Sequence, residues 1–528
     1  MRQTWNAVLS LLLSAALLLT AGCESRSEPQ PAKRQVLRYV NYSPIGDVDP
    51  YNLTSSAQYT VACHVLEGLM RVYQYELCYG MAEGYEISED GCTYRFFLRE
   101  DACYSDGTPV QAADFQRTMR RLAAECYLPS QLGLIENARE VYKGELPPEE
   151  LAVWTEGQRT LCIQLEHPAA QFLQILALPT YAPTRSDRGD TLRPEDCNGP
   201  FVLEGPETDG VLSMEKNGYY WNAAKIHLDR VEAVTMSGTT EAYEAFERGE
   251  VQVVPLPLEG EDTHSGGVVR QVQTGIMEYI KLWCQGEENP LRSQNLRLAL
   301  NNGLDRTAYV QTLGSTVIQP WARCVLPEIP GMRETYVEEF PNTPFSLTGE
   351  LEKARGQLDQ ALQELNLADA SELELTLVVH NDSWSIREGQ ALVDQWQEHL
   401  GLTVKLECVE DIASFTAEAG RGVMVLEGSI GEYNDPVVYL EGWTEWEGLP
   451  FGVKTALRQL LVQAAVQTDR SIRLNCLHQT EELLLEQGVL IPLQIREDRL
   501  LIDPHLRGFE TSVILAGGGY EFLYGCFY

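Results

Sequence analysis

The segment GSIGEYNDP at 428–436 places two carboxylates in a glycine-rich turn, one residue after the apolar run VMVL. Such a run is typical of a buried strand, so Glu432, Tyr433 and Asp435 follow the end of that strand. A carboxylate in a space that loses its water can bind an ammonium group through a charge-assisted hydrogen bond, roughly twice as strong as a neutral one. Glu432 is therefore a candidate for binding a cationic group. The alternative interpretation is a turn in which Glu432 faces water.

Catalytic motifs are absent from the sequence. It contains no HExxH, no G-x-S-x-G, no P-loop and no Rossmann glycine fingerprint. Its eight histidines are dispersed along the chain without the spacing of a metal site. We therefore predict no catalytic residue, no metal and no cofactor, and we expect a binding protein rather than an enzyme.

The first residues have the pattern of an export signal. The apolar stretch at 7–19 is too short for a hydrocarbon core, which needs about 20 residues, and small residues precede Cys23. This pattern resembles the lipobox of bacterial lipoproteins, in which the cysteine becomes lipidated. We expect a signal peptide over residues 1–22 and a lipidated tether over 23–35. The alternative is an ordinary cleaved signal with a coincidental cysteine.

Composition narrows the classes of partner. The chain carries 77 acidic and 40 basic residues, a formal charge of −37, which argues against binding of nucleic acid or anionic lipid through general electrostatics. No later apolar run approaches a membrane-spanning length. We expect an extracytoplasmic monomer, anchored to the cell membrane at Cys23 alone. The twelve further cysteines have no CxxC pair, so they form either a few bridges or buried free thiols.

The second half of the chain alternates between strand and helix patterns. Strand-like segments at 373–380, 402–408 and 423–428 are separated by helical segments, of which 386–400 is the longest. This order predicts parallel strands with crossover helices, and hence an α/β lobe.

The first half of the chain also contains clear helix patterns. Apolar spacing predicts a helix over 55–73, and a second helix is expected to start at Thr108. Thr108 would be the N-cap of that helix, with Pro109 at its first helical position.

Several segments together resemble the large solute-binding lipoproteins of ATP-driven peptide importers, family 5, which includes oligopeptide- and dipeptide-binding proteins. Their order along the chain follows that of the family, and they span almost the whole mature sequence. The segments are DGCTYRFFLREDACYSDGTPVQAADF (90–115), CNGPFVLE (197–204), MEKNGYYWNAAKIHLDRVEAV (214–234), EAYEAFERGEVQVV (241–254), NLRLALNNGLDRTAYV (295–310) and QGVLIPLQ (487–494).

The resemblance implies an α/β, two-lobed periplasmic-binding-protein-like fold of type II, in its large three-subdomain form, with a hinge and an interlobe cleft. Hinges are expected near 278–283 and 491–495. Closure of the cleft would trap a solute, and the permease subunits of an ABC importer would recognise the closed form. The expected domains are lobe I (36–67, 194–280 and 495–528), a subdomain inserted in lobe I (68–193) and lobe II (281–494).

The resemblance also implies a set of ligand contacts. Glu432 occupies the place of the acidic residue that, in peptide-binding members, pairs with the ligand's α-ammonium. For the other candidates, packing or a turn is the alternative to ligand contact. These candidates are Tyr433, Asp435, Tyr42, Ser43, Asn198, Gly199 and Trp443.

Two departures from the family pattern leave the cargo open. The arginine that some oligopeptide binders carry is Leu426 here, and the common aromatic residue is Ser429. Either another cation binds a peptide's α-carboxylate, the ligand extends past the cleft, or the solute is not a peptide. Peptides are the expected cargo. The alternatives are a metal chelate, an opine or an oligosaccharide on the same fold, a secreted peptide hydrolase, and a receptor that senses a peptide signal.

Overall fold

A computed structural model describes most of the chain. By its internal contacts the chain divides between Gln35 and Val36, and residues 36–528 form one compact unit. The predicted signal peptide, Cys23 and nearly all of the tether lie outside the described residues, and no helix within them is long and apolar enough to cross a membrane. The described residues are 34–73, 76–125, 132–185, 191–257, 266–412, 421–508, 522 and 524–527.

Eleven strands of the described chain form one large mixed sheet. They are β1 (Val36–Asn41), β8 (Phe201–Leu203), β9 (Val211–Lys216), β10 (Arg230–Thr235), β11 (Val253–Pro255), β12 (Val268–Leu282), β13 (Ile318–Pro320), β14 (Leu375–His380), β15 (Val404–Val409), β16 (Val423–Ile430) and β17 (Leu490–Ile502). The order is β15-β14-β16-β12-β17-β11-β1-β10-β9-β8, and β13 pairs with β17.

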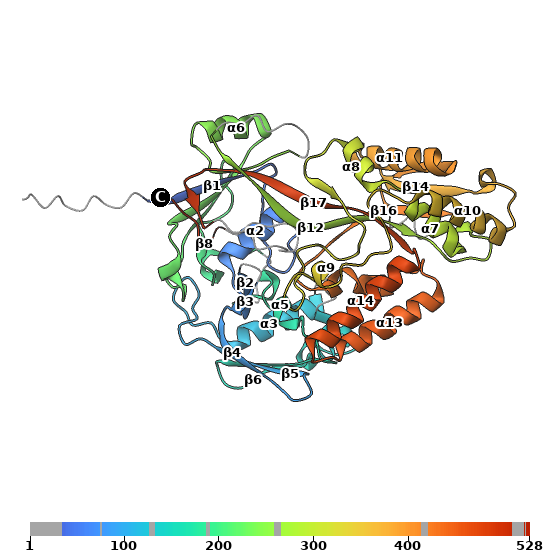
Figure 1. Ribbon diagram of the computed structural model, residues 1–528. Coiled ribbons are helices and arrows are strands. Elements are labelled where there is room, and N and C mark those ends of the chain that lie inside the picture. Colours follow the sequence, from blue (N-terminus) through green and yellow to red (C-terminus); the bar gives the residue numbers. More distant parts are fainter. Residues whose placement is uncertain are drawn as a thin grey trace, which may run out of the picture. The chain divides into compact units, whose positions relative to one another are not determined.

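The two longest strands, β12 and β17, join the lobes. They pair antiparallel from Val268 opposite Ile502 to Lys281 opposite Leu490, with a shift in register around Gly275. Figure 1 shows them crossing from the side of β1 to the side of β14 and β16. β17 is buried along most of its length, and its buried residues include the polar side chains Gln494, Glu497 and Arg499. The predicted hinge segments lie within these strands, and their hinge motion stays a prediction.

The α/β lobe predicted for the second half is confirmed. β14 pairs in parallel with both β15 and β16, and α11 (Ser383–Leu400) makes the crossover from β14 to β15. Asp382 caps α11 by accepting hydrogen bonds from the amides of Trp384 and Ser385. Trp396 is fully buried and donates its indole N–H to the carbonyl of Leu300 at 2.9 Å. The other helices of this half are α7 (Gln294–Asn302), α8 (Arg306–Leu313), α9 (Tyr336–Glu339), α10 (Leu351–Leu365), α13 (Phe451–Ala465) and α14 (Arg470–Glu486).

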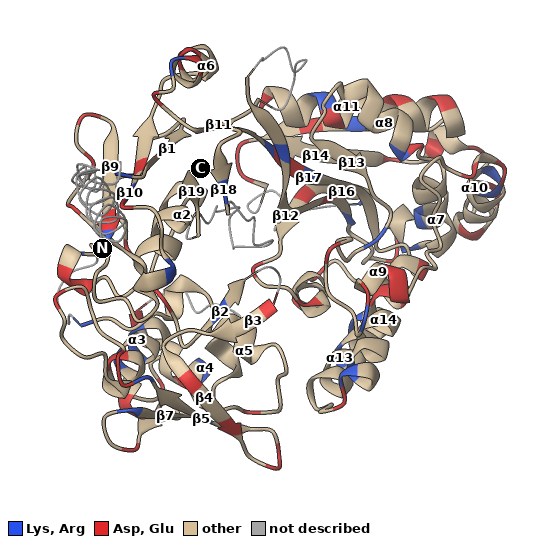
Figure 2. Cartoon of the chain, turned by 60° about the vertical axis from the view of Figure 1, so that its left-hand side comes forward, with Lys and Arg blue, Asp and Glu red and all other residues tan. Residues whose placement is uncertain are grey.

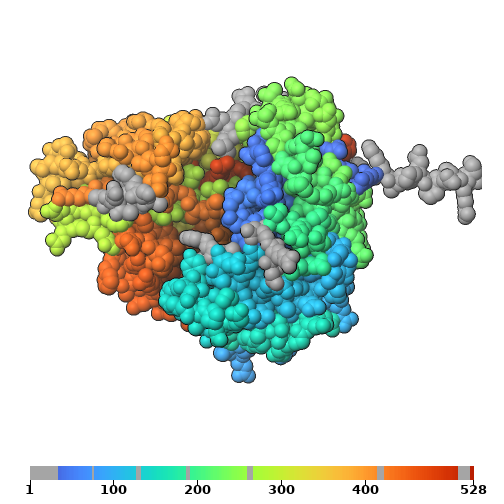
Figure 3. Space-filling view, turned by 180° about the vertical axis from the view of Figure 1, so that it is seen from behind, coloured from blue at the N-terminus to red at the C-terminus, as the bar shows by residue number. Residues whose placement is uncertain are grey.

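A smaller sheet lies within residues 68–193. Its order is β4 (Ala82–Ile87), β5 (Thr93–Leu98), β7 (Thr160–Gln164) and β6 (Val153–Thr155). It is accompanied by the hairpin of β2 (Met70–Tyr73) and β3 (Glu76–Tyr79), and by α3 (Ala112–Glu125), α4 (Ala138–Tyr142), α5 (Phe172–Ile175) and the 3₁₀ turn η3 (Pro179–Tyr181). Figure 3 shows this segment, in cyan and teal, next to the orange helices α13 and α14. The other described elements are α2 (Ser56–Val65), α6 (Thr239–Glu247), β18 (Leu506–Arg507) and β19 (Cys526–Phe527).

Two helix predictions were wrong at their boundaries. The helix expected from Thr108 starts at Ala112, because Pro109 pairs with Cys103 in an isolated β-bridge and so cannot begin the helix. The helix expected over 55–73 is capped by Ser55 but ends at Val65, and Met70 begins a strand. Tertiary contacts overrode the helical spacing there, since the amide of Met70 bonds the carbonyl of Leu176.

Candidate ligand-binding site

A pocket opens where the end of α2, the α5–η3 segment and the loop after β16 meet. Its empty volume, open mouth included, is about 600 Å³. Walls therefore come from both halves of the chain, as the resemblance led us to expect for an interlobe cleft. The lining residues are Cys63, Leu66, Glu67, Gly68, Met70, Arg71, Val72, Gln174, Ala177, Leu178, Pro179, Pro200, Glu432, Tyr433 and Asn434.

Glu432 is the carboxylate that this pocket leaves uncompensated. It lines the pocket, and within the described residues no hydrogen-bond donor or cation pairs with it. Burial raises the pKa of its carboxyl above the ordinary value. The opposite wall is near, because burial and then the charge of Glu432 raise the pKa of the Tyr181 hydroxyl in η3. A cationic group in the pocket would supply the missing countercharge.

Asp435 has a different role. Its two oxygens accept hydrogen bonds from the Arg473 guanidinium at 2.7 and 2.8 Å, and one of them also accepts from the amide of Val437 at 3.0 Å. The latter bond caps the 3₁₀ turn η8 (Pro436–Tyr439). Asp435 therefore holds the loop in place rather than presenting a free carboxylate to the pocket. Its predicted ligand contact stays a prediction.

Tyr433 and Trp443 support the same loop. Tyr433 lines the pocket, and its hydroxyl donates to Glu441 at 3.3 Å at the start of η9 (Glu441–Thr444). Burial raises the pKa of Glu441 to about 7, although the bond from Tyr433 opposes this shift. Trp443 is buried against Tyr279, with ring centroids 5.3 Å apart, and is not among the residues that line the pocket.

Asn198 and Gly199 shape the pocket wall from within the protein. The Asn198 amide donates to the carbonyl of Glu67 at 2.7 Å and accepts from its N–H at 3.1 Å. The Gly199 amide donates to Val65 at 2.9 Å, and a Cβ at Gly199 would lie 2.7 Å from the nitrogen of Leu66. Both residues are engaged by the end of α2, so their contact with a ligand stays a prediction.

Tyr42 and Ser43 are not among the residues that line the pocket. The Tyr42 hydroxyl donates to the carbonyl of Pro255 at 2.7 Å, which ties the end of β1 to β11. Ser43 is exposed. Their contact with a ligand stays a prediction.

Sequence reasoning missed a cation in the pocket wall. Arg71 donates to Glu67 at 3.3 Å, and Glu67 also accepts hydrogen bonds from Tyr220 at 2.7 Å and from the indole of Trp221 at 2.6 Å. Burial, opposed by the charge of Arg71, raises the pKa of Glu67. The i, i+4 spacing of Glu67 and Arg71 could have indicated an ion pair. Because a helix was expected over 55–73, the sequence did not indicate that these side chains line a pocket.

Metal-ligating side chains do not cluster in the described residues. No group of three or more histidines, cysteines, aspartates or glutamates there could hold a metal ion.

Comparisons with known proteins identify the family. A family model described as bacterial extracellular solute-binding proteins, family 5 middle, matches residues 76–449, more than half of the chain. The chain is 25% identical to the oligopeptide-binding protein OppA of Bacillus subtilis, over 98% of each chain. It is 27% identical to the probable deoxycholate-binding periplasmic protein YgiS of Escherichia coli, over 94% of each.

A solved structure confirms the expected fold. The chain is similar to the MppA periplasmic murein tripeptide binding protein in its unliganded open form, with a TM-score of 0.76 and 22% identity. The similarity covers 93% of this chain and 96% of that chain. The two-lobed α/β fold expected from the sequence is thus confirmed.

Proposed function

This chain belongs to the bacterial extracellular solute-binding proteins of family 5, and we propose that it captures peptides and delivers them to the permease subunits of an ABC importer. One observation carries the proposal for peptides. Glu432 lines a pocket between the two halves of the chain and has no countercharge among the described residues. The α-ammonium of a peptide supplies that charge at the chain end where every unmodified peptide has it.

Binding follows from closure of the cleft. When the walls approach each other, water leaves the pocket and the ion pair between Glu432 and the ammonium strengthens, because the local dielectric falls. Arg71 on the other wall is a candidate for the ligand's carboxylate, a role for which Leu426 is unsuited. The long strands β12 and β17 are the elements about which the lobes would turn.

The proposal also includes the location of the protein in the cell. We place the protein outside the cytoplasm, anchored to the cell membrane through lipidated Cys23, and acting as a monomer. It binds and releases its ligand without breaking a bond in it.

A second candidate is a non-peptide solute, which the similarity to the YgiS protein favours. A bile acid such as deoxycholate carries an anionic carboxylate on an apolar body. Repulsion by Glu432 would oppose an anion beside it, whereas an ammonium would be attracted, so the pocket favours peptides.

Binding measurements test the proposal. A defined library of two- to six-residue peptides is screened by thermal shift, and hits are measured by calorimetry beside their N-acetylated forms and deoxycholate. Glu432→Gln is expected to lower affinity for a free peptide by roughly 10- to 100-fold, about 1.5–3 kcal/mol for an interfacial charge left unpaired. N-acetylation of the peptide should lower the affinity of the wild type by a similar factor. It should not lower the affinity of the variant further. The control Glu445→Gln, an exposed residue of the same region, should bind normally.

The pH dependence supplies an independent check. The ammonium binds ionised Glu432, so affinity is full above the pKa of this carboxyl and falls as pH drops through it. Since burial raises that pKa, the loss starts at a higher pH than for an exposed glutamate. Binding of deoxycholate but of no peptide, or equal affinities for free and acetylated peptides, would contradict the proposal.

A further inference from the structure

Arg473 in α14 joins side chains from two distant parts of the chain. Its Nη1 and Nη2 donate to the two carboxylate oxygens of Asp435 at 2.7 and 2.8 Å. Nη2 also donates to the side-chain oxygen of Gln171 at 3.1 Å, across 302 positions of the sequence. All three residues are buried, so these hydrogen bonds are shielded from water.

The partners of Arg473 belong to opposite walls of the pocket. Asp435 follows Glu432 in the loop after β16, which forms one wall. Gln171 directly precedes α5, and Gln174 of α5 lines the other wall. Gln171 itself is not among the residues that line the pocket. Arg473 therefore connects the two walls without occupying the space between them.

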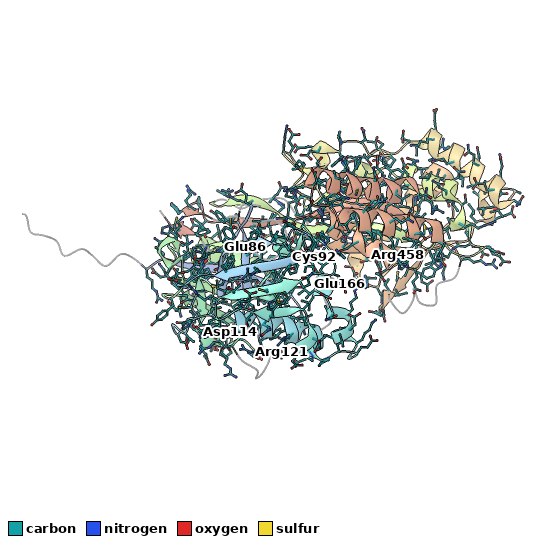
Figure 4. All side chains as sticks on the ribbon, turned by 90° about the horizontal axis from the view of Figure 1, so that it is seen from below. Glu86, Cys92, Asp114, Arg121, Glu166 and Arg458 are labelled. Carbon is teal, nitrogen blue, oxygen red and sulfur yellow. The ribbon has the colours of Figure 1, made fainter. Side chains whose placement is uncertain are left out.

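A second contact joins the same two parts of the chain. A Cβ at Gly91, in the turn between β4 and β5, would lie 3.7 Å from Cγ2 of Thr468, in the loop between α13 and α14. Figure 4 shows Cys92 and Glu166 of the segment 68–193 on its side toward α13, which carries Arg458. The segment 68–193 and the pair of α13 and α14 thus meet at two points.

The pairing with Asp435 prepares Arg473 for Gln171. A carboxylate bound through two hydrogen bonds fixes the plane of the guanidinium, so its remaining donors point in set directions. If the walls separated, water would replace Gln171 at Nη2. If the walls stayed together without the Gln171 oxygen, a charged donor would be buried without its acceptor, which costs more than for a neutral donor. The contact therefore favours the arrangement in which the walls are joined.

We propose that Gln171 and Arg473 are positioning residues, which hold the two walls together and so raise the affinity for every ligand by the same factor. Both partners belong to the chain, so their hydrogen bond does not require a ligand. A ligand that needs joined walls binds with an affinity scaled by the fraction of molecules in which they are joined. The inference goes beyond the proposed function, since it does not depend on whether the ligand is a peptide.

Gln171→Leu tests the contact, because it removes the acceptor and leaves Arg473 and Asp435 in place. Gln171→Glu is the rescue variant, since its carboxyl group keeps an oxygen acceptor whether or not it is ionised. Gln158→Leu, at an exposed position of the segment 68–193, is the matched control. Small-angle X-ray scattering of each full chain without ligand gives its radius of gyration. Calorimetry with three library peptides of different length gives the affinities.

Without ligand, Gln171→Leu should have a larger radius of gyration than the wild type, and a saturating peptide should remove this difference. Its affinities for the three peptides should fall by a common factor of roughly 3- to 20-fold, as the joined arrangement becomes less populated. Gln171→Glu and Gln158→Leu should stay within threefold of the wild type. A merely structural role would instead lower the melting temperature and leave the ligand-free scattering unchanged.

Two results would overturn the inference. One is an equal radius of gyration for the ligand-free wild type and Gln171→Leu. The other is a loss of affinity that differs more than threefold among the peptides, because Gln171 would then contact the ligand. Should Gln171→Leu not fold, Gln171→Ala, which also removes the acceptor, takes its place.

The proposed function is tested separately. If the inference fails and Glu432→Gln still weakens peptide binding, the proposed function stands. If the wild type binds no peptide of the library, the proposed function fails, and the ligand-free scattering alone decides whether Gln171 and Arg473 hold the walls together.

Discussion

At the scale of single residues, the two carboxylates of the loop after β16 lie in opposite environments. Glu432 lines the pocket without a countercharge in the described chain, whereas Asp435 accepts two hydrogen bonds from Arg473. The difference does not lie in residue type. It arises because α14 places a guanidinium beside one carboxylate and not beside the other, so that one residue supports the loop while the other can serve the ligand.

The buried carboxyl of Glu441 leads to a prediction about stability at the residue scale. Burial raises its pKa to about 7, above the roughly 4.3 of an unfolded chain. The folded state therefore holds the proton more tightly, and this group lowers stability as pH rises from about 4.5 through 7. Glu441→Gln keeps an acceptor for the Tyr433 hydroxyl and removes the charge. It should raise the melting temperature by about 1–2 °C at pH 8, a gain of ~1–2 kcal/mol, with no gain at pH 4.5.

Scanning fluorimetry at both pH values measures the effect. Glu445→Gln, an exposed neighbour in sequence, should show no such pH-dependent difference. A lower melting temperature for Glu441→Gln at pH 8 would mean that its charge is stabilised in the folded state, contrary to the inference from burial.

At the scale of elements, the candidate ligand residues Asn198 and Gly199 contact the end of α2 and hold it in place. Asn198 pairs with the backbone of Glu67 through both ends of its amide, and Gly199 lies against the backbone of Val65 and Leu66. This junction ends the helix and orients Glu67 and Arg71 toward the pocket. The residues of the CNGPF segment thus set the position of a wall, and Pro200 contributes to its lining.

Gly199→Ala should disturb this junction. The new methyl carbon would lie 2.7 Å from both Leu66 nitrogen and Val65 carbonyl carbon, which are backbone atoms and cannot move aside alone. We expect a loss of ~1–3 kcal/mol in unfolding free energy, typical of overpacking, and weaker ligand binding. Gly218→Ala is the control, since no heavy atom lies within 4 Å of its added carbon. Equal chemical denaturation curves for the two variants would contradict the proposed close contact.

At the scale of the whole molecule, one sheet passes through both lobes and the cysteines form no bridges in the described residues. Cys63 aside, the ten described cysteines are free, and five of them are buried. Figure 2 shows the positions of acidic residues, in red, distributed over many of the helices and strands, in keeping with the charge of −37. The protein therefore derives its stability from a large core, and its thiols act there as small apolar groups.

Reducing agent should therefore leave the melting temperature unchanged. A disulfide typically contributes about 2–4 kcal/mol, so its reduction would be visible as a lower melting temperature. Of the described thiols, Cys408 is the exposed one and should react first with a labelling reagent under native conditions. Mass spectrometry of the labelled peptides checks this order. A fall in melting temperature on reduction, or slow labelling of Cys408, would contradict the free-thiol state.

Local sequence patterns predicted those elements that nearby residues determine. The strand-like segments at 373–380, 402–408 and 423–428, with their crossover spacing, predicted the parallel strands that the structure has as β14, β15 and β16. Periodicity failed at the end of α2 and at the start of α3, where contacts from distant segments ended or delayed a helix. The hinge and the domain boundaries stay predictions.

The sequence by itself determined the family resemblance, the α/β pattern and the position of Glu432 after a buried strand, because each of these depends on residues close together in the chain. Only the tertiary structure decided which polar groups have partners. Arg473 reaches Asp435 across 38 positions and Gln171 across 302, and Asn198 reaches Glu67 across 131. Residue spacing cannot report such contacts. Whether a carboxylate or an amide is satisfied or is left for a ligand therefore depends on how the distant segments pack.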